Sequence, residues 1–287
     1  MFPPRRRTTL AQALALAAGL VIALAGERWA CAVDPFEIQV YDGTSDAPRV
    51  AGLELHINDV ASGRTTATPP QQAPDHQAHF TLEPSLGLTP SWEIGGYLQT
   101  ALLPDGQFDV AGVKLRSKLV TPPDWRPRWR LGCNFELSWV RAIYEAEPWG
   151  AEIRPIVAWE DPRWLVAVNP IVELSLRGAA PAFAPALMAM FKLGSVLALG
   201  VEYYGDIGPV TSPARGRDQE HYLFEAVNVL SGDLDVNAGV GEGLTAGSNA
   251  LVAKVILGYR FAGPRAAPAT PRAAACPTPV VVAGCDR

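Results

Sequence analysis

Basic side chains recur at every second position of the segment 113–119, where Lys114, Arg116 and Lys118 alternate with apolar and small residues. Successive side chains of an extended chain point to opposite faces, so these three cations form a row on one face of a strand. A row of cations facing water can steer anions or aromatic acids along a pore. The same row facing carboxylates would instead form an ion-pair network that fills a narrow space.

Charged residues of both signs occupy the equivalent face of many other segments. Mid-strand charges are costly in a dry protein core, whereas a water-filled or ion-paired barrel lumen accommodates them. The residues predicted to line such a lumen are Glu54, Glu83, Glu93, Lys114, Arg116, Lys118, Arg130, Glu136, Glu152, Arg154, Glu173, Arg177, Lys192, Glu202, Lys254 and Arg260.

The histidines offer a second kind of chemistry, metal binding. His76 and His79 follow Asp75 near the end of one predicted loop, and His221 lies near the end of another. Outer loops of one barrel can meet, but these residues lack the close spacing of metal-ligand motifs. We therefore predict no metal site and no cofactor.

Hydrolysis of lipids or esters is a third candidate chemistry. A catalytic triad is recognised by the geometry of its members, and no Ser/His pair is indicated, because the alternation directs His56 to the polar face. The sequence also contains no G-x-S-x-G, phosphate-loop or H-E-x-x-H motif. We predict that the protein is not an enzyme, and a hydrolase remains the third hypothesis.

Alternation of apolar and polar residues dominates the chain from 49 to 261 and positions these side chains. It predicts an all-β protein of about 12 antiparallel strands, longer than the roughly 5–6 residues usual in globular sheets and long enough to cross a bilayer at a tilt. Four prolines inside them (84, 155, 170 and 185) indicate bulges or misplaced strand ends. The predicted strands are 49–61, 77–88, 91–103, 107–120, 127–142, 149–160, 163–177, 182–193, 196–206, 220–230, 233–243 and 249–261.

The connections between these strands are sorted by length. Transmembrane barrels alternate long outer loops with short inner turns. The odd-numbered connections include 62–76, 143–148 and 207–219, whereas the even-numbered ones include the dipeptides 89–90, 161–162, 194–195 and 231–232. A soluble sandwich gives no reason for this sorting, so it favours a transmembrane up-and-down barrel, although 104–106 and 121–126 depart from the rule.

Aromatic residues gather near the predicted strand ends. Trp149 and Trp159 bracket one strand, and ten residues at about 3.3 Å span about 33 Å, which a tilt of about 40° reduces to about 25 Å, the height of the apolar band in such barrels. The predicted aromatic girdle consists of Trp92, Trp149, Trp159, Trp164, Tyr203 and Tyr259.

The two ends of the chain differ from its body. Residues 1–32 are typical of a signal peptide, with three arginines, an apolar stretch and small-x-small sites. The Pro/Ala-rich residues 262–287 predict a disordered tail, in which Cys276 and Cys285 could form a disulfide. Segment 33–48 either enters the lumen as a plug or extends the sheet.

Without these ends, residues 33–261 carry 17 basic and 27 acidic side chains. This excess of negative charge repels phosphate backbones, so we predict no nucleic-acid partner.

Several segments resemble a proteobacterial family of outer-membrane barrels that are described as transporters or as phenol-degradation MetA-pathway proteins. They are LGLTPSWEIGGYLQTAL (86–102), GVKLRSKL (112–119), WGAEIRPIVAW (149–159), LVAVNPIVELSL (165–176), LALGVEYYGDIGP (197–209), EHYLFEAV (220–227) and KVILGYRF (254–261). The resemblance implies a channel without naming its solute. The last segment, with Tyr259 and Phe261, also resembles the signal that bacterial barrels present to the barrel-assembly machinery.

The sequence therefore predicts one barrel domain at 49–261, exported to the outer membrane of a Gram-negative bacterium and surrounded by its lipids. The first functional hypothesis is a passive channel or transporter for small solutes. The second is a non-conducting structural or surface-interaction barrel that works through the loops 62–76 and 207–219. Since a barrel of about 12 strands lies between filled and open kinds, both interpretations stay open.

Overall fold

The computed structural model describes residues 33–66, 69–122, 124–126 and 128–261. The predicted signal peptide 1–32 and tail 262–287, with the cysteines in them, lie outside the described residues. Within the described part of the chain, no helix is long and apolar enough to cross a membrane.

Twelve long strands and one two-residue strand make up the described fold. The long strands agree with the predicted ones to within two residues at each end, so the predicted all-β architecture is confirmed. The strands are β1 (Ala51–Ser62), β2 (Ala78–Thr89), β3 (Trp92–Leu102), β4 (Phe108–Val120), β5 (Trp129–Val140), β6 (Trp149–Glu160), β7 (Trp164–Ser175), β8 (Ala182–Lys192), β9 (Leu197–Asp206), β10 (Gly208–Pro209), β11 (Glu220–Ser231), β12 (Leu234–Gly243) and β13 (Leu251–Phe261).

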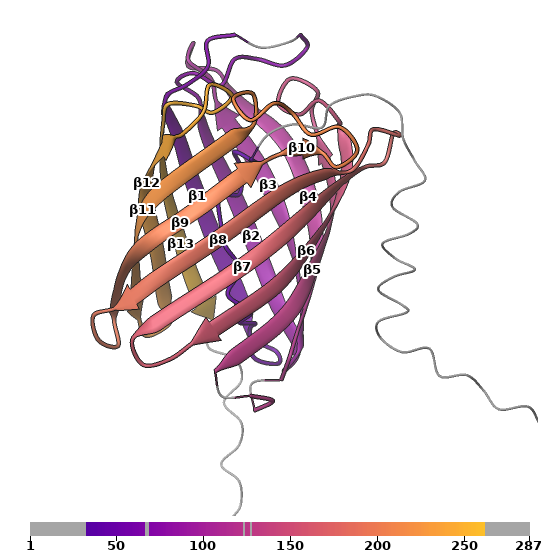
Figure 1. The fold of residues 1–287 in the computed structure, drawn as a ribbon. Helices are drawn as coiled ribbons and strands as arrows, with labels where there is room; N and C mark the ends of the chain where they lie inside the picture. The colour runs from indigo at the N-terminus through magenta and orange to yellow at the C-terminus, as the bar shows by residue number, and fades with distance from the viewer. Residues whose placement is uncertain (1–32, 67–68, 123, 127, 262–287) are drawn as a thin grey trace, which may run out of the picture.

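The long strands form one closed antiparallel barrel (Figure 1). Strands that follow each other in the chain pair with each other, and the pairing of β1 with β13 closes the sheet. The short β10 pairs only with the beginning of β8, where Gly208 lies opposite Phe183. Because the barrel closes on itself, no long strand presents a free edge.

Long and short connections lie at opposite ends of the barrel (Figure 1). We call one end the long-loop end, with connections 63–77, 103–107, 141–148, 176–181, 207–219 and 244–250. The other is the short-turn end, with connections 90–91, 121–128, 161–163, 193–196 and 232–233. The connection 121–128 is long for its end, as the sequence indicated.

The outer face of the barrel is apolar and bordered by aromatic side chains. Leu115, at the middle of β4, is 70% exposed. Trp129 lies opposite Trp159 near the short-turn end, and Trp139 lies opposite Trp149 near the long-loop end. The strands β5 and β6 therefore carry an aromatic residue at both edges of an apolar band. The other predicted girdle residues also lie on the outer face, namely Trp92, Trp164, Tyr203 and Tyr259.

The prolines inside the strands interrupt ladders without shifting them. Pro84 lies where the β2–β3 ladder passes from Leu82 opposite Leu98 to Ser85 opposite Gly95 in one register. Pro155 and Pro170 lie at such a gap in the β6–β7 ladder, whose register is also unchanged, and Pro185 lies opposite Pro170 in the continuous β7–β8 register. The expectation of bulges at these prolines is therefore wrong, and the register shifts lie elsewhere in β1–β4. A proline costs the ladder one donor but needs no extra residue.

Candidate functional site in the barrel lumen

Residues 33–48, here called the plug, lie inside the barrel and contain no strand. Phe36 packs near the long-loop end against Ala101, Ala111 and Val140. At the other end, the amide of Arg49 donates to the carbonyl of Gly87 beside the short turns, and β1 begins two residues later. The plug therefore runs through the lumen from the long-loop end to the short-turn end. Of the two interpretations left open for this segment, the structure shows the first: residues 33–48 lie in the lumen and do not extend the sheet.

Apolar plug residues fill one side of the lumen. Ile38 and Val40 belong to a buried cluster with apolar side chains of β6–β9, β11 and β13, such as Ala167, Met190 and Phe224. The lumen is thus apolar over part of its wall, which the alternation of charges in the other strands did not reveal. This packing stabilises the plug by removing apolar surface from water.

Polar contacts hold the middle of the plug. The amide of Tyr41 donates to Asn169 Oδ1 at 2.7 Å, and Asn169 Nδ2 donates to the carbonyl of Tyr41 at 3.0 Å. The Tyr41 hydroxyl lies 2.7 Å from that of Tyr97, which in turn donates to Glu136. Asn169 thus replaces the ladder partner that an extended segment would otherwise lack.

The remaining wall charges form a network of ion pairs. Arg116 contacts Glu83 at 2.6 Å and Glu93 at 2.7 Å, and Lys118 contacts Glu93 at 3.0 Å. The predicted row of cations therefore faces the lumen and is paired there with carboxylates. Buried charges of this kind remain ionised only when they are paired and hydrogen-bonded.

Most of the residues predicted to line the lumen point into it. Those that are buried in the lumen or line its cavities are Glu54, Glu83, Glu93, Lys114, Arg116, Lys118, Glu136, Glu152, Arg154, Glu173, Glu202, Lys254 and Arg260. Arg130 and Lys192 share Glu160 as an ion-pair partner at the short-turn end. Arg177 is a correction: β7 ends at Ser175, so Arg177 is exposed in a turn at the long-loop end and does not line the lumen.

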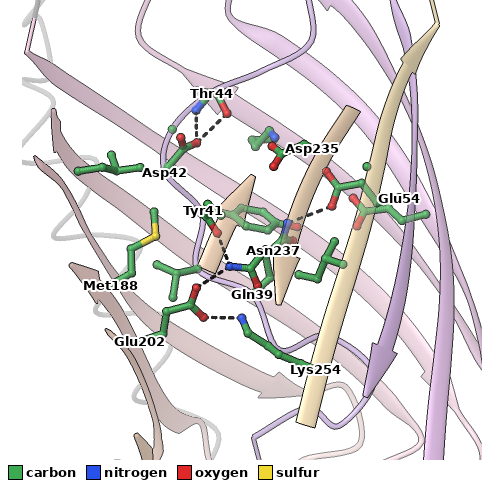
Figure 2. Close-up of a pocket in the computed structure, with 18 of the residues that line it drawn as sticks. Gln39, Tyr41, Asp42, Thr44, Glu54, Met188, Glu202, Asp235, Asn237 and Lys254 are labelled. Atoms are coloured by element: carbon green, nitrogen blue, oxygen red, sulfur yellow. Dashed lines mark hydrogen bonds and ion pairs between the residues drawn. The ribbon is translucent and has the colours of Figure 1, made fainter. Parts of the chain in front are cut away.

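A cavity of about 130 Å³ lies in the lumen beside the plug. Figure 2 shows Gln39 and Tyr41 of the plug facing Glu54, Glu202 and Lys254 of the wall across this space. A water molecule occupies about 30 Å³ of liquid, so the cavity has room for a few waters and not for a continuous pore. The plug and the wall side chains around it thus occupy this part of the lumen.

The histidines are not gathered in the loops. His79 is buried, with Nε2 3.2 Å from Gln77 Oε1, and His221 Nδ1 lies 2.6 Å from the Tyr203 hydroxyl. Among the described residues, the group whose ligand atoms lie close enough to share a metal ion is Glu54, His56 and Glu83 in the wall.

Glu54, His56 and Glu83 pair with neighbouring side chains. His56 Nε2 lies 3.0 Å from Glu83, and Arg116 Nε lies 2.6 Å from the other oxygen of the same carboxylate. Gln39 of the plug donates to Glu54 at 3.0 Å. These neighbouring donors make the group part of the ion-pair network.

One loop carboxyl beside the plug has a perturbed acidity. Burial, and next the charge of Asp34, raise the pKa of Glu145 from 4.5 to about 8. Glu145 lies in the connection 141–148 and lines a cavity of about 80 Å³ together with Asp34 and Phe36 of the plug. The outer end of the plug therefore meets an acidic side chain that favours its neutral form near pH 7.

Sequence reasoning did not identify the plug's own contact residues. Asp34, Glu37, Asp42 and Asp46 all pair with wall bases, and Asn169 was not singled out. The available signal was the composition of 33–48, which has four acidic residues, no basic residue and apolar side chains at 36, 38 and 40.

Comparisons with known proteins support the fold. No family model matches the sequence, and no curated protein matches it. The COG4313 outer membrane channel from Pseudomonas putida F1 matches with a TM-score of 0.56 and 10% identity, over 78% of this chain and 100% of that chain. A KdgM porin matches with a TM-score of 0.50 and 10% identity, over 74% of this chain and 99% of that chain. At such identities the likeness concerns the barrel fold alone.

Proposed function

We propose that the protein is a passive channel for small solutes in the outer membrane of a Gram-negative bacterium, and that this conformation is its closed state. The observation that carries the proposal is a closed barrel with an apolar exterior and a charged, hydrogen-bonding lumen. A protein in water would place its charges outside, whereas a barrel in lipid places them around an aqueous path. The shared fold with a known outer membrane channel, and the resemblance to MetA-pathway-like barrels, support the same assignment.

The plug can leave the lumen without dismantling the barrel. None of its residues belongs to a strand, and the ladders of the long strands close without it. Its contacts are side-chain packing, ion pairs and single hydrogen bonds, which are individually worth about 1 kcal/mol net. We therefore assign gating to movement of residues 33–48, with β1 as the fixed attachment.

Two partners follow from the same assignment. Outer-membrane lipids would cover the apolar band. The barrel-assembly machinery would recognise β13, where the centroids of the outward Tyr259 and Phe261 rings lie 5.1 Å apart.

A non-conducting barrel is the second candidate, and the dense ion-pair network favours it. A network that never opens would leave the connections of the long-loop end, the longest of them 63–77 and 207–219, for interaction with other molecules. No Ser/His pair supports the hydrolase hypothesis among the described residues. The histidine rings there have carboxylate, amide or tyrosine partners, and none is hydrogen-bonded to a serine hydroxyl.

Conductance in a planar bilayer tests the proposal. The full chain should be mostly closed with brief openings, and a variant lacking 33–45 should be persistently open. Both proteins must first show the heat-dependent gel shift of a folded barrel. If the folded truncated variant conducts no more than the bare bilayer, the channel assignment is wrong and the structural barrel takes its place.

A further inference from the structure

The plug is an acidic segment with no basic residue of its own. Residues 33–48 contain four carboxylates, at 34, 37, 42 and 46, and neither lysine nor arginine. The carboxylates are three to five residues apart, which is about 10–17 Å in an extended chain. In its charge pattern the plug is therefore an extended polyanion.

The four plug carboxylates meet four basic residues of the wall. Near the long-loop end, Asp34 lies 2.5 Å from Lys114, and Glu37 lies 3.0 Å from Arg154 and 3.4 Å from Lys114. The contact of Lys114 with Asp34 is also a hydrogen bond, and charge-assisted hydrogen bonds are roughly twice as strong as neutral ones.

The pattern continues towards the short-turn end. Asp42 lies 3.1 Å from Arg130, and Asp46 lies 3.4 Å from Arg260. The four bases thus form a track along the whole plug rather than one local site.

Arg130 of this track, and Lys254 beside it, also bind neutral acceptors of the plug backbone. Arg130 Nε donates to the carbonyl of Asp42 at 2.7 Å, and Lys254 Nζ donates to the carbonyl of Ile38 at 3.0 Å. Figure 2 shows Lys254 beside the plug, paired with Glu202. An extended chain that offers both carboxylates and oxygen acceptors therefore finds donors along the full length of the lumen.

Each of the four bases also has a carboxylate partner in the wall. Lys114 lies 3.2 Å from Glu136, Arg154 lies 2.6 Å from Glu152, Arg260 lies 3.8 Å from Asp235, and Arg130 is paired with Glu160. The empty track is therefore close to neutral and has little power to select small inorganic ions. An oligomer gains from many such contacts at once, as multivalent ligands do.

We propose that the channel takes an extended oligomer bearing carboxylates, and that the plug occupies the place of this solute in the closed state. This inference rests on the proposed channel function. An acidic peptide and an acidic oligosaccharide share the chemistry that the track recognises. We expect the track to give no selectivity for small anions such as chloride.

The test uses the full chain with four plug substitutions, Asp34→Asn, Glu37→Gln, Asp42→Asn and Asp46→Asn. Loss of the ion pairs should open the channel, and the open current is then measured with added oligomers of about the plug's length. A glutamate oligomer and a uronic-acid oligomer should block the current at concentrations at least about tenfold lower than a lysine oligomer or a neutral glucan, since tenfold corresponds to one modest charged contact.

Substitutions in the wall give the matched control. Adding Lys114→Gln and Arg154→Gln should raise the half-blocking concentration of the glutamate oligomer about tenfold or more. Arg141→Gln, which removes a base paired with Asp109 at the long-loop rim, should change it less than about twofold. Folding of every variant is checked by the heat-dependent gel shift.

The outcomes separate the inference from the function beneath it. Open current with no preference for the anionic oligomers, or a preference that survives loss of Lys114 and Arg154, overturns the solute class and leaves the channel standing. Block by only one of the two anionic oligomers keeps the inference and identifies the source of the carboxylates. If neither this variant nor the one lacking 33–45 conducts although both are folded, the proposed function fails and the inference falls with it.

Discussion

Replacing Asn169 by alanine should release the plug while leaving the barrel intact. The Asn169 side chain is completely buried, and its amide forms two hydrogen bonds, both to the backbone of Tyr41. The change deletes a side chain on the lumen face of β7 and removes no ladder hydrogen bond. Its effect should therefore fall on the equilibrium between the docked and the withdrawn plug.

The magnitude follows from these two bonds. Each contributes about 1 kcal/mol net, and each plug group left buried without a partner costs about 1–3 kcal/mol. The withdrawn plug exposes both groups to water, so the docked state should lose about 2–6 kcal/mol in total. This corresponds to an increase of about 30- to 20,000-fold in the ratio of open to closed channels.

Single-channel recording measures this ratio directly as the fraction of time spent open. Asn134→Ala is the matched control, since Asn134 is equally buried on the lumen face but donates to Glu136 of the wall at 2.8 Å. If Asn169→Ala opens the channel no more often than Asn134→Ala, the plug is not held through Tyr41, and the gating argument is refuted.

Three further predictions concern other parts of the molecule. Burial raises the pKa of Glu145 from 4.5 to about 8, so between these values the native state binds one more proton at this group than the unfolded chain does. The contribution of Glu145 to stability is therefore complete below about pH 4.5 and is lost as the pH rises to about 8. Glu145→Gln should flatten this part of the stability curve, measured by the temperature of the gel shift across pH. Leu115→Arg should cost about 2–4 kcal/mol in refolding into lipid vesicles if Leu115 lies at mid-membrane, whereas Leu244→Arg in a loop should cost about 0–1 kcal/mol; equal costs would argue against the lipid-facing band. Gly87→Ala would place a Cβ 2.2 Å from the Ala47 carbonyl oxygen, so the plug's attachment must shift, at about 1–3 kcal/mol, seen as a lower urea midpoint than for the unchanged protein.

The strands were predictable because their information is local. One face of each strand meets an apolar surrounding and the other meets the lumen. Apolar and polar residues therefore alternate with a period of two in each strand. The error at Arg177 shows the limit of the pattern. The alternation continues past Ser175, but the ladder with β6 ends at the pair Gly150 and Ser175, and only the partner strand determines that point.

The position of the plug was not predictable in the same way, because its contacts join distant parts of the chain. Tyr41 and Asn169 are 128 residues apart, and no periodicity relates them. The acidic composition of 33–48 was visible, and so were the basic residues of the strands, but their pairing depends on which strands face each other across the closed barrel. The aromatic girdle needed no such knowledge, because its position follows from the strand ends alone.

The ion-pair network and the channel are compatible, although the sequence presented them as alternatives. Removing one partner of a buried pair normally costs about 3–5 kcal/mol, because the other charge is left alone in the interior. Withdrawal of the plug avoids this cost at Lys114 and Arg154, since each keeps a wall carboxylate, Glu136 or Glu152, when Asp34 and Glu37 depart. A wall that neutralises its own bases can release an acidic plug and accept an acidic solute in its place. The wall's own ion pairs at Lys114 and Arg154 therefore reduce the free-energy cost of withdrawing the plug.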